Sequence, residues 1–283
     1  MIRNFISVTK PGIIMGNVIT LSGGFFLASR GVINYWLLLA TIVGISLIIA
    51  CGCVINNYID RDIDGLMKRT QKRVLVKGLI SPRAIFIYAF CLGALGTGGL
   101  LFCTNILATL LALSGLFVYV VIYTMVLKRN SVLSTVVGSI SGAIPPLVGY
   151  CAVTNHIDAG AIVLFIMLCL WQVPHSYAIA IFRFEDYVAA KIPVLPVKKN
   201  ILVAKFHMLL FVFLFVVASV SLYYFGYVGR SYLAIALMLG LLWLFLSAKG
   251  FVVANTTRWA RQMFFLSILI ITILSIAMAI NYI

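Results

Sequence analysis

Long apolar runs separated by short polar connections follow one another along the whole chain. Each run holds about 18–25 residues, the length of α-helix that crosses roughly 30 Å of hydrocarbon. The nine runs cover residues 11–29, 35–57, 84–103, 106–127, 132–152, 160–182, 204–226, 231–248 and 263–282. None of them alternates apolar with polar residues, so they are predicted to be helices and not barrel strands. The pattern therefore predicts an all-α polytopic membrane protein with nine transmembrane helices.

The connections and the prolines inside two runs add detail to this prediction. No proline- or serine-rich linker divides the chain, so residues 1–283 are predicted to form one domain. Pro145 and Pro146 are expected to break the fifth helix, and Pro174 is expected to kink the sixth. Broken helices inside a membrane usually line a cavity, so the fifth helix is expected beside one.

The composition excludes an ordinary soluble domain. Hydrophobic residues make up 64% of the chain and charged residues 10%, whereas a soluble domain carries about 25% charged residues. The six cysteines form no Cys-x-x-Cys pair and have no histidine at zinc-site spacing. They are therefore expected to pack as small apolar side chains.

The basic residues are distributed very unevenly between the two sides of the predicted bundle. The chain has 21 lysines and arginines and a formal net charge of +15. Of these 21 residues, only Arg30 and Arg230 lie on the side opposite the N-terminus. An excess of lysine and arginine marks the cytoplasmic side, so the N-terminus is predicted to be cytoplasmic and the C-terminus to lie on the other side. Topology accounts for the positive charge, and no nucleic-acid partner is expected.

Five of the six acidic residues fall in two short stretches, both on the predicted cytoplasmic side. A carboxylate in so apolar a chain is costly unless it is hydrated, paired or bound to a metal. In the first stretch Asn56, Asp60 and Asp64 are spaced four apart, so a continuing helix places them on one face. Asn57 can assist them, whereas Asp62 points away. Oxygen ligands in this arrangement suit Mg²⁺, whose coordination is usually completed by water and substrate phosphates.

Basic residues follow the first acidic stretch at once. Lys68, Arg69, Lys72 and Arg73 all lie within nine residues of Asp64. Guanidinium groups match the geometry of phosphate oxygens, so the acids and arginines together predict a diphosphate site. The alternative is a hydrated loop in which the acids pair with the loop's own arginines.

The second acidic stretch lies at the end of the sixth run. It contains Arg183, Glu185 and Asp186, and His175 lies about two turns deeper, directly after Pro174. An ionisable residue inside a membrane helix is a functional candidate. This run is therefore predicted to contribute to the same site as the first stretch.

Four segments carry a resemblance that covers nearly the whole chain. They are T-K-P-G-I-I-M-G-N, N-N-Y-I-D-R-D-I-D followed by R-T-Q-K-R, S-G-A-I-P-P-L-V-G-Y, and W-Q-V-P-H-S-Y with E-D-Y-V-A-A-K-I-P-V-L-P-V. The second segment resembles the first aspartate motif of the UbiA-type intramembrane prenyltransferases. The others resemble the branch of that family that farnesylates haem. The resemblance implies nine helices around a central cavity, in a bacterial-type plasma (inner) membrane.

The resemblance also implies the ligands and the roles of the candidate residues. It implies Mg²⁺ as cofactor and farnesyl diphosphate and haem b as substrates, and it leaves open a contact with the assembly of a haem-using oxidase. The residues in metal-binding positions are Asn56, Asp60, Asp64 and Asp186. The catalytic candidates are Asp60, Asp64, Asp186 and His175. The residues expected to bind substrate are Asn56, Asn57, Arg69, Arg73, Lys128, Arg129 and Arg183.

The second acidic stretch departs from the family's pattern. The wider family has a second D-x-x-x-D motif, but here Phe182 and Ala190 stand four residues before and after Asp186. The number of metal ions, one or two, therefore stays open. For His175 the alternatives are a base, a haem contact or a simple interhelical hydrogen bond.

Two other functions are compatible with parts of the sequence. The first aspartate motif alone also fits a prenyltransferase that acts on a quinone precursor or another aromatic acceptor. A membrane transporter is the alternative from another class, but its ionisable residues are usually near the middle of the bilayer. The acidic stretches here lie at helix ends on one side, which favours the enzyme.

Overall fold

The computed structural model describes residues 2–281, and its elements are helices joined by short connections. The long helices are α2 (Pro11–Ser29), α3 (Tyr35–Ile59), α5 (Pro82–Cys103), α6 (Ile106–Phe117) with its π-helical continuation η1 (Val118–Leu127), α7 (Ser134–Thr154), α8 (Ala159–Phe182), α11 (Ile201–Tyr224), α12 (Arg230–Lys249) and α13 (Thr256–Ile280). The short helices are α1 (Ile2–Val8), α4 (Arg61–Leu66), α9 (Phe184–Ala189) and α10 (Leu195–Lys198). The all-α prediction is confirmed.

Within residues 2–281, nine helices are long and apolar enough to cross a membrane, counting α6 with η1 as one. All nine predicted spans are therefore confirmed, although one boundary was wrong. The last span was predicted to begin at residue 263, whereas α13 begins at Thr256. The Asn255 side chain caps this helix by accepting a hydrogen bond from the amide of Arg258 at 2.9 Å. The first turns of α13 carry charged residues, so hydropathy detects only the apolar part of the helix. The predicted end at residue 282 lies outside the described residues.

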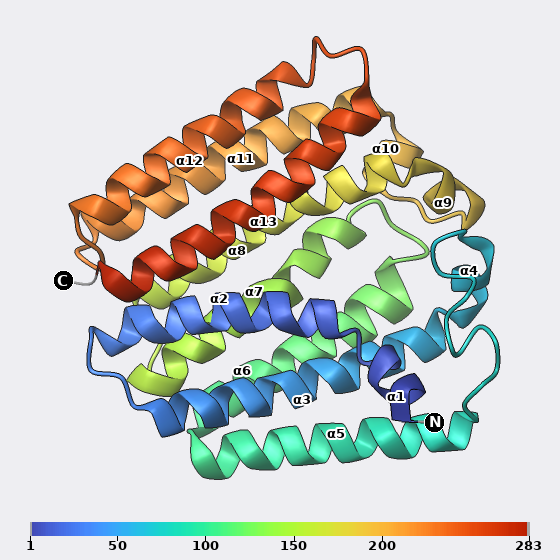
Figure 1. The fold of residues 1–283 in the computed structure, drawn as a ribbon, viewed down its shortest axis with the longest axis horizontal. Coiled ribbons are helices and arrows are strands. Elements are labelled where there is room, and N and C mark those ends of the chain that lie inside the picture. The colour runs from blue at the N-terminus through green and yellow to red at the C-terminus, as the bar shows by residue number, and fades with distance from the viewer. Residues whose placement is uncertain (1, 282–283) are drawn as a thin grey trace.

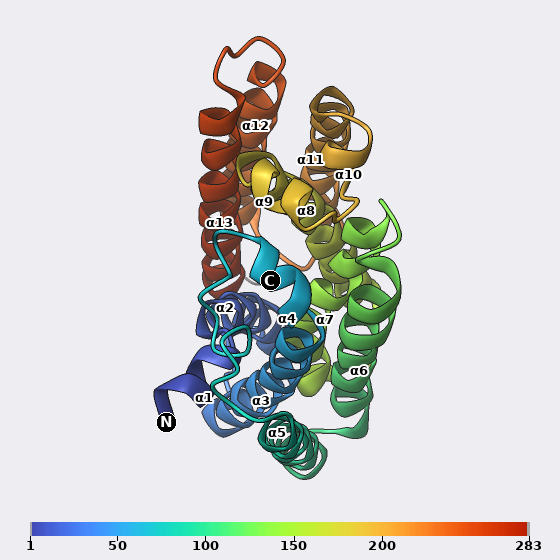
Figure 2. The same ribbon diagram turned by 90° about the vertical axis from the view of Figure 1, so that its right-hand side faces the viewer.

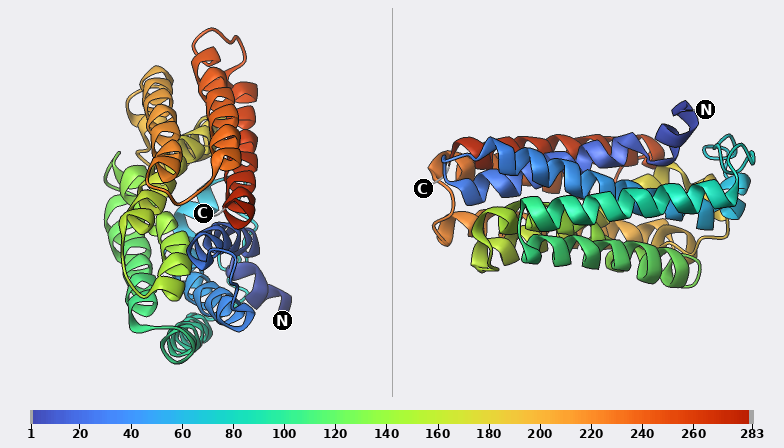
Figure 3. Two further views of the ribbon diagram at one scale, coloured as in Figure 1. Left: turned by 90° about the vertical axis from the view of Figure 1, so that its left-hand side faces the viewer. Right: turned by 90° about the horizontal axis from the view of Figure 1, so that it is seen from below.

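The long helices run side by side, and the short helices α1, α4, α9 and α10 gather at one end of the bundle (Figure 1). We call this the acidic end, because it carries the segments 56–64 and 183–190. Seen from this end, α4 lies within a ring formed by α2, α3, α7, α8 and α13 (Figure 2). The C-terminal end of the described chain lies at the opposite end (Figure 3). The two acidic stretches thus share one end of the bundle, as the positions of their helices predicted.

Helix α7 crosses α2 at very close range. A Cβ atom on Gly24 of α2 would lie 2.1 Å from the carbonyl oxygen of Pro146, and one on Gly149 would lie 2.2 Å from that of Leu21. Only glycine permits such an approach of two backbones. The prediction that Pro145 and Pro146 break this helix was wrong, because α7 continues from Ser134 to Thr154. Tight packing on α2 holds this backbone in place where the prolines remove amide donors.

Two further sequence expectations concern α8 and the cysteines. Helix α8 is also continuous, from Ala159 to Phe182, with Pro174 inside it. All six cysteines are free thiols, and Cys51, Cys53 and Cys151 are buried. The expectation that cysteines pack as small apolar side chains holds for these three.

Candidate active site

The predicted metal ligands lie at the junction of α3 and α4, and helical spacing persists across it. The amide of Asp60 donates to the carbonyl of Asn56 at 2.9 Å, and the amide of Asp64 donates to the carbonyl of Asp60 at 2.8 Å. Although α3 ends at Ile59, the i to i+4 hydrogen bonds therefore continue through the junction. Asn56, Asp60 and Asp64 are only 3%, 1% and 2% exposed. The predicted shared face is confirmed, and it faces inward.

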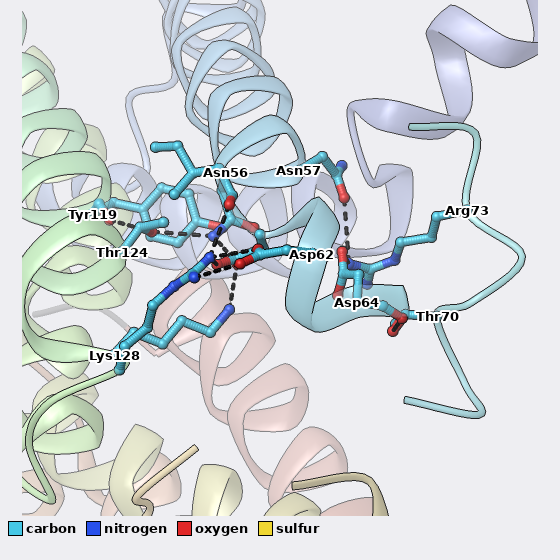
Figure 4. Close-up of polar contacts among 12 residues, drawn as sticks. Asn56, Asn57, Asp62, Asp64, Thr70, Arg73, Tyr119, Thr124 and Lys128 are labelled. Atoms are coloured by element: carbon cyan, nitrogen blue, oxygen red, sulfur yellow. Dashed lines mark hydrogen bonds and ion pairs between the residues drawn. The ribbon is translucent and has the colours of Figure 1, made fainter. Parts of the chain in front are cut away.

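Each of these three side chains is held by a cation from a different part of the chain. The Nζ of Lys10 donates to Oδ1 of Asn56 at 2.5 Å. Lys128 forms an ion pair with Oδ2 of Asp60. Arg73 donates from Nη1 to Oδ2 of Asp64 at 2.5 Å, and Figure 4 shows these two side chains beside Asn57. Burial lowers the pKa of Lys10 to about 8.

The alternative interpretation was a hydrated loop in which the acids pair with the loop's own arginines. It explains only one of these three contacts, the pair of Arg73 with Asp64. Arg73 and Asp64 belong to the same connection between α3 and α5. Lys10 instead precedes α2, and Lys128 follows η1. Tertiary structure has brought both lysines to the acids. Such a convergence of cations on buried oxygens is typical of a binding site for a charged ligand.

The oxygens of Asp60 differ in their surroundings. Oδ2 accepts from Asn56 at 2.7 Å as well as from Lys128. Oδ1 is buried without a hydrogen-bond partner among the described residues, and Nη2 of Arg129 lies 3.8 Å from it. A buried carboxylate oxygen without a partner is costly. This orphaned oxygen, beside an amide oxygen and a second carboxylate, fits a hard cation such as Mg²⁺.

The π-helical segment η1 fixes the orientation of Asn56. The amide of Asn56 also donates to Oγ1 of Thr124 at 3.1 Å. Thr124 is fully buried, and its hydroxyl donates to the carbonyl of Tyr119, five residues earlier, at 2.8 Å. With both amide hydrogens directed at Asp60 and Thr124, the Asn56 carbonyl oxygen is left to face cations.

Arg129 has a positioning role at the surface of the site. It donates to both carboxylate oxygens of Asp62 at 2.7 Å and to the carbonyl of Ile59 at 2.9 Å. These bonds tie the end of η1 to the end of α3. The hydrogen bond from Arg129 lowers the pKa of Asp62 to about 2. Asp62 is exposed, unlike Asp60 and Asp64, but it shares Nη2 of Arg129 with Asp60, whose Oδ1 lies 3.8 Å from that atom.

Asn57 also positions other groups. Its amide donates to the carbonyl of Val8 at 2.7 Å, and its Oδ1 accepts from Nη1 of Arg73 at 3.3 Å. Asn57 is 4% exposed. The side chain thereby holds the corner between α1 and α2 against α3, close to Lys10.

Two pockets open beside these residues. The larger has a volume of about 280 Å³ and the smaller about 230 Å³. Lys10, Asp64 and Arg73 line both of them. The larger pocket is also lined by Asn56, Arg69, Tyr119, Tyr123, Lys128, Gly138, Ser141, Gln172, Ser176, Ile179, Tyr187 and Ile192. Five predicted site residues, Asn56, Asp64, Arg69, Arg73 and Lys128, thus meet at one pocket.

The second acidic stretch lies against the first through α4 and α9. Ile63 and Met67 pack with Ala180, Ala190 and Ile192 in one apolar cluster. This contact brings the two connections together at the acidic end.

Asp186 and its neighbour Tyr187 lie in this second stretch. Asp186 is 7% exposed, and within residues 2–281 its carboxylate forms no ion pair. Burial raises the pKa of Tyr187, and the charges of Arg69 and Lys128 counteract this effect. Tyr187 also lines the larger pocket, together with Arg69 and Lys128.

No three His, Cys, Asp or Glu side chains among residues 2–281 gather closely enough to hold a metal without other ligands. A metal ion at Asn56, Asp60 and Asp64 would therefore need oxygens from its substrate, which is how Mg²⁺ commonly binds. The role of Asp186 as a ligand stays a prediction.

His175 forms an interhelical contact in the structure. Its Nδ1 lies 2.7 Å from Oγ of Ser267 on α13. Its ring stacks on Trp171, with centroids 4.7 Å apart, and lies 4.8 Å from the ring of Phe264. Of the three alternatives for His175, the interhelical hydrogen bond is thus present. Arg183, predicted to bind substrate, lies over the ring of Phe182 at 5.6 Å and does not line either pocket.

Several residues of the site were missed from sequence. They are Lys10, Tyr119, Tyr123, Thr124, Ser141, Gln172, Ser176 and Tyr187. In the sequence, Lys10 is only one of the many basic residues that mark the predicted cytoplasmic side. Its position directly before Pro11 also marks a helix start. Gln172 lies in the W-Q-V-P-H segment, three residues before the predicted site residue His175. Thr124 gives no sequence signal, because a π-helix cannot be read from an apolar run.

Comparison with known proteins shows what the chain is similar to. The model of the UbiA prenyltransferase family matches residues 17–269. A protoheme IX farnesyltransferase of Edwardsiella ictaluri is 53% identical over 282 residues, which cover 100% of this chain and 95% of the relative. One of Pseudomonas syringae pv. syringae is 52% identical over 281 residues, covering 99% and 95%.

Solved structures share the fold. A structure described as digeranylgeranylglyceryl phosphate synthase superposes with a TM-score of 0.81 at 19% identity, over 99% of this chain and 98% of that one. A UbiA homolog from Archaeoglobus fulgidus bound to GPP and Mg²⁺ superposes with a TM-score of 0.72 at 15% identity, over 98% of this chain and 99% of that one. At these identities the likeness concerns the fold alone.

Proposed function

The chain belongs to the UbiA prenyltransferase family, and we propose that it transfers the farnesyl group of farnesyl diphosphate to a vinyl group of haem b. The relatives that support this acceptor are about half identical in sequence and match almost end to end. The observation that carries the proposal is the set of three buried oxygen-bearing side chains, Asn56, Asp60 and Asp64, each in contact with a cation. Asn56 and Asp64 line the larger pocket, whereas Asp60 lines neither pocket. This set of side chains has the composition that a metal-bound diphosphate requires.

Asn56, Asp60 and Asp64 would hold Mg²⁺, with Asp186 as a further candidate ligand. Bound there, Mg²⁺ supplies a positive charge that stabilises the departing diphosphate. Arg69 and Arg73 line the same pocket, and their guanidinium groups suit phosphate oxygens. These fixed charges act where negative charge develops as the bond between carbon and oxygen breaks.

Part of the wall of the larger pocket is apolar, and this part would help to keep water from the allylic cation. Tyr123, Ile179 and Ile192 contribute apolar surface to its lining. An apolar wall protects a reactive cation until the acceptor reaches it. Once diphosphate has left, the vinyl group of haem would form the new carbon–carbon bond with the allylic cation. Water would then add to the cation left on the porphyrin side, supplying the hydroxyl group of the product and releasing a proton.

The proposal places the acidic end on the cytoplasmic side of a bacterial inner membrane. Nearly all basic residues lie at this end, which supports that orientation through the positive-inside rule. The N-terminus would then be cytoplasmic. A test is labelling of a single cysteine introduced at either end of a variant that lacks the six native cysteines, in sealed inner-membrane vesicles.

The decisive experiment is conversion of haem b to a farnesylated haem by the purified protein, read by mass and compared with and without Mg²⁺. Asp60→Asn and Asp64→Asn should lose activity, whereas Asp62→Asn, which changes an exposed acid of the same stretch, should retain it. A product formed on a quinone precursor but not on haem would identify a different acceptor. Ion or solute flux without any product would instead indicate a transporter.

A further inference from the structure

Lys10 occupies a backbone conformation that lysine rarely adopts. Its φ of 55° and ψ of 68° lie in the left-handed region, which costs energy for a residue with a Cβ. The corner is held by Asn57, which donates to the carbonyl of Val8 at 2.7 Å, and by Pro11 at the start of α2. The strained corner directs the long side chain into the site, where Nζ reaches Oδ1 of Asn56 at 2.5 Å.

Lys10, Lys128 and Arg73 bind the oxygens that a metal ion would need. Lys10 holds the only oxygen of the Asn56 side chain, while Lys128 and Arg73 each hold one oxygen of Asp60 or Asp64. The Asn56 oxygen has two lone pairs, but a metal ion and an ammonium group bound to the same oxygen lie close enough to repel each other strongly. A metal that coordinates Asn56 is therefore expected to displace the ammonium of Lys10.

The local charges decide when that displacement is favourable. Lys128 and Arg73 already pair with Asp60 and Asp64, Arg129 lies 3.8 Å from Asp60, and Lys10 adds a positive charge at Asn56. A divalent metal that enters alone therefore adds charge of the same sign as the excess. A metal that enters with diphosphate brings anionic oxygens that the displaced ammonium groups can bind. Lys10 lines both pockets and thus has space in which to move.

We propose that Lys10 and Lys128 exchange partners when the substrate binds. Before binding, their ammonium groups hold the oxygens of Asn56 and Asp60. When metal and diphosphate arrive together, the metal takes these oxygens and the ammonium groups bind the diphosphate. Metal and diphosphate therefore bind as one unit, and neither binds well alone. This inference rests on the proposed function, because it assumes that Asn56, Asp60 and Asp64 bind a metal diphosphate. Lys10 is a positioning residue before substrate arrives and a substrate contact afterwards.

The test measures binding and needs no turnover. Mn²⁺ serves as a metal probe, with the unbound ion quantified by electron paramagnetic resonance, and inorganic pyrophosphate serves as the diphosphate probe. In the wild type, pyrophosphate should raise Mn²⁺ affinity by a factor within about 5–150, the usual range for coupled sites, and Mn²⁺ should raise pyrophosphate affinity equally. Lys10→Asn removes the charge with a residue that tolerates left-handed backbone.

In Lys10→Asn, Mn²⁺ alone should bind more tightly, pyrophosphate should bind more weakly, and the coupling should shrink. Lys77→Asn is the matched control, because Lys77 is an exposed lysine of the same end that lines neither pocket. It should leave all three quantities unchanged. Lys128→Met should shift both affinities in the same directions as Lys10→Asn and provides a second test if Lys10→Asn does not fold.

A folded variant in which Mn²⁺ affinity stays constant or falls overturns the exchange, and so does one in which pyrophosphate affinity does not fall. A parallel loss of both affinities would mean that Lys10 is only structural. The proposed function is tested separately, since a wild type that makes farnesylated haem without this coupling refutes the exchange alone.

Discussion

Replacing Asp60 by asparagine should damage stability and activity together, and the structure gives the size of each effect. Asp60 is 1% exposed, and its partner Lys128 has a side chain that is 15% exposed. Removing one member of a buried ion pair costs about 3–5 kcal/mol. Because Lys128 keeps some contact with solvent, we expect a loss of about 3 kcal/mol. Loss of one fixed charge from an active site typically costs about 10²–10³-fold in turnover, or about 2.7–4 kcal/mol.

Asp62→Asn is the matched comparison, since the two acids are two residues apart and each pairs with a basic residue. The Asp62 side chain is 61% exposed, so its pair with Arg129 should contribute about 1 kcal/mol or less. We therefore expect a loss of stability of about 1 kcal/mol or less and, because Asp62 lines neither pocket, turnover close to that of the wild type.

The assay is a single-turnover measurement of farnesylated haem by mass in lipid nanodiscs, with saturating Mg²⁺ and farnesyl diphosphate, beside a thermal unfolding curve. The reasoning would be refuted if both variants lost activity equally, or if Asp60→Asn kept wild-type turnover. A variant that lost turnover but no stability would contradict the ion pair with Lys128 and leave the ligand role standing.

Three further predictions follow from the same contacts. Gly24→Ala places a Cβ 2.1 Å from the Pro146 carbonyl oxygen and should lower the free energy of unfolding by about 1–3 kcal/mol. Gly12→Ala, whose Cβ would have nothing within 4 Å, should leave the free energy of unfolding unchanged. Thermal unfolding distinguishes the two variants. Chelation of divalent ions should abolish farnesyl transfer, and added Mg²⁺ should restore it. The hydrogen bond from Arg129 lowers the pKa of Asp62 to about 2. The ion pair between Asp62 and Arg129 therefore stabilises the fold fully above pH ~3.9, and this stabilisation is lost as the pH falls towards 2. Between pH 5 and 8, Asp62→Asn should leave the shape of the stability–pH curve unchanged.

The positions of the helices could be predicted from sequence because the bilayer imposes a local requirement. About 20 consecutive apolar residues suffice to define a crossing helix, whatever the rest of the chain does. The spacing of Asn56, Asp60 and Asp64 is local for the same reason, since four residues make about one helical turn. The two errors, at α13 and at Pro145 and Pro146, arose where a capping side chain or a packed neighbour overrode that local signal.

By itself, then, the sequence determined the nine membrane-spanning helices and the helical spacing of Asn56, Asp60 and Asp64. Only the tertiary structure decided which cations meet those ligands. Lys10 and Lys128 lie 46 and 68 residues from their partners Asn56 and Asp60, and π-helical geometry places Thr124 on Asn56. A hydrogen bond or an ion pair acts over a few ångströms, so its partners depend on how the whole bundle packs, and no spacing along the chain records that arrangement.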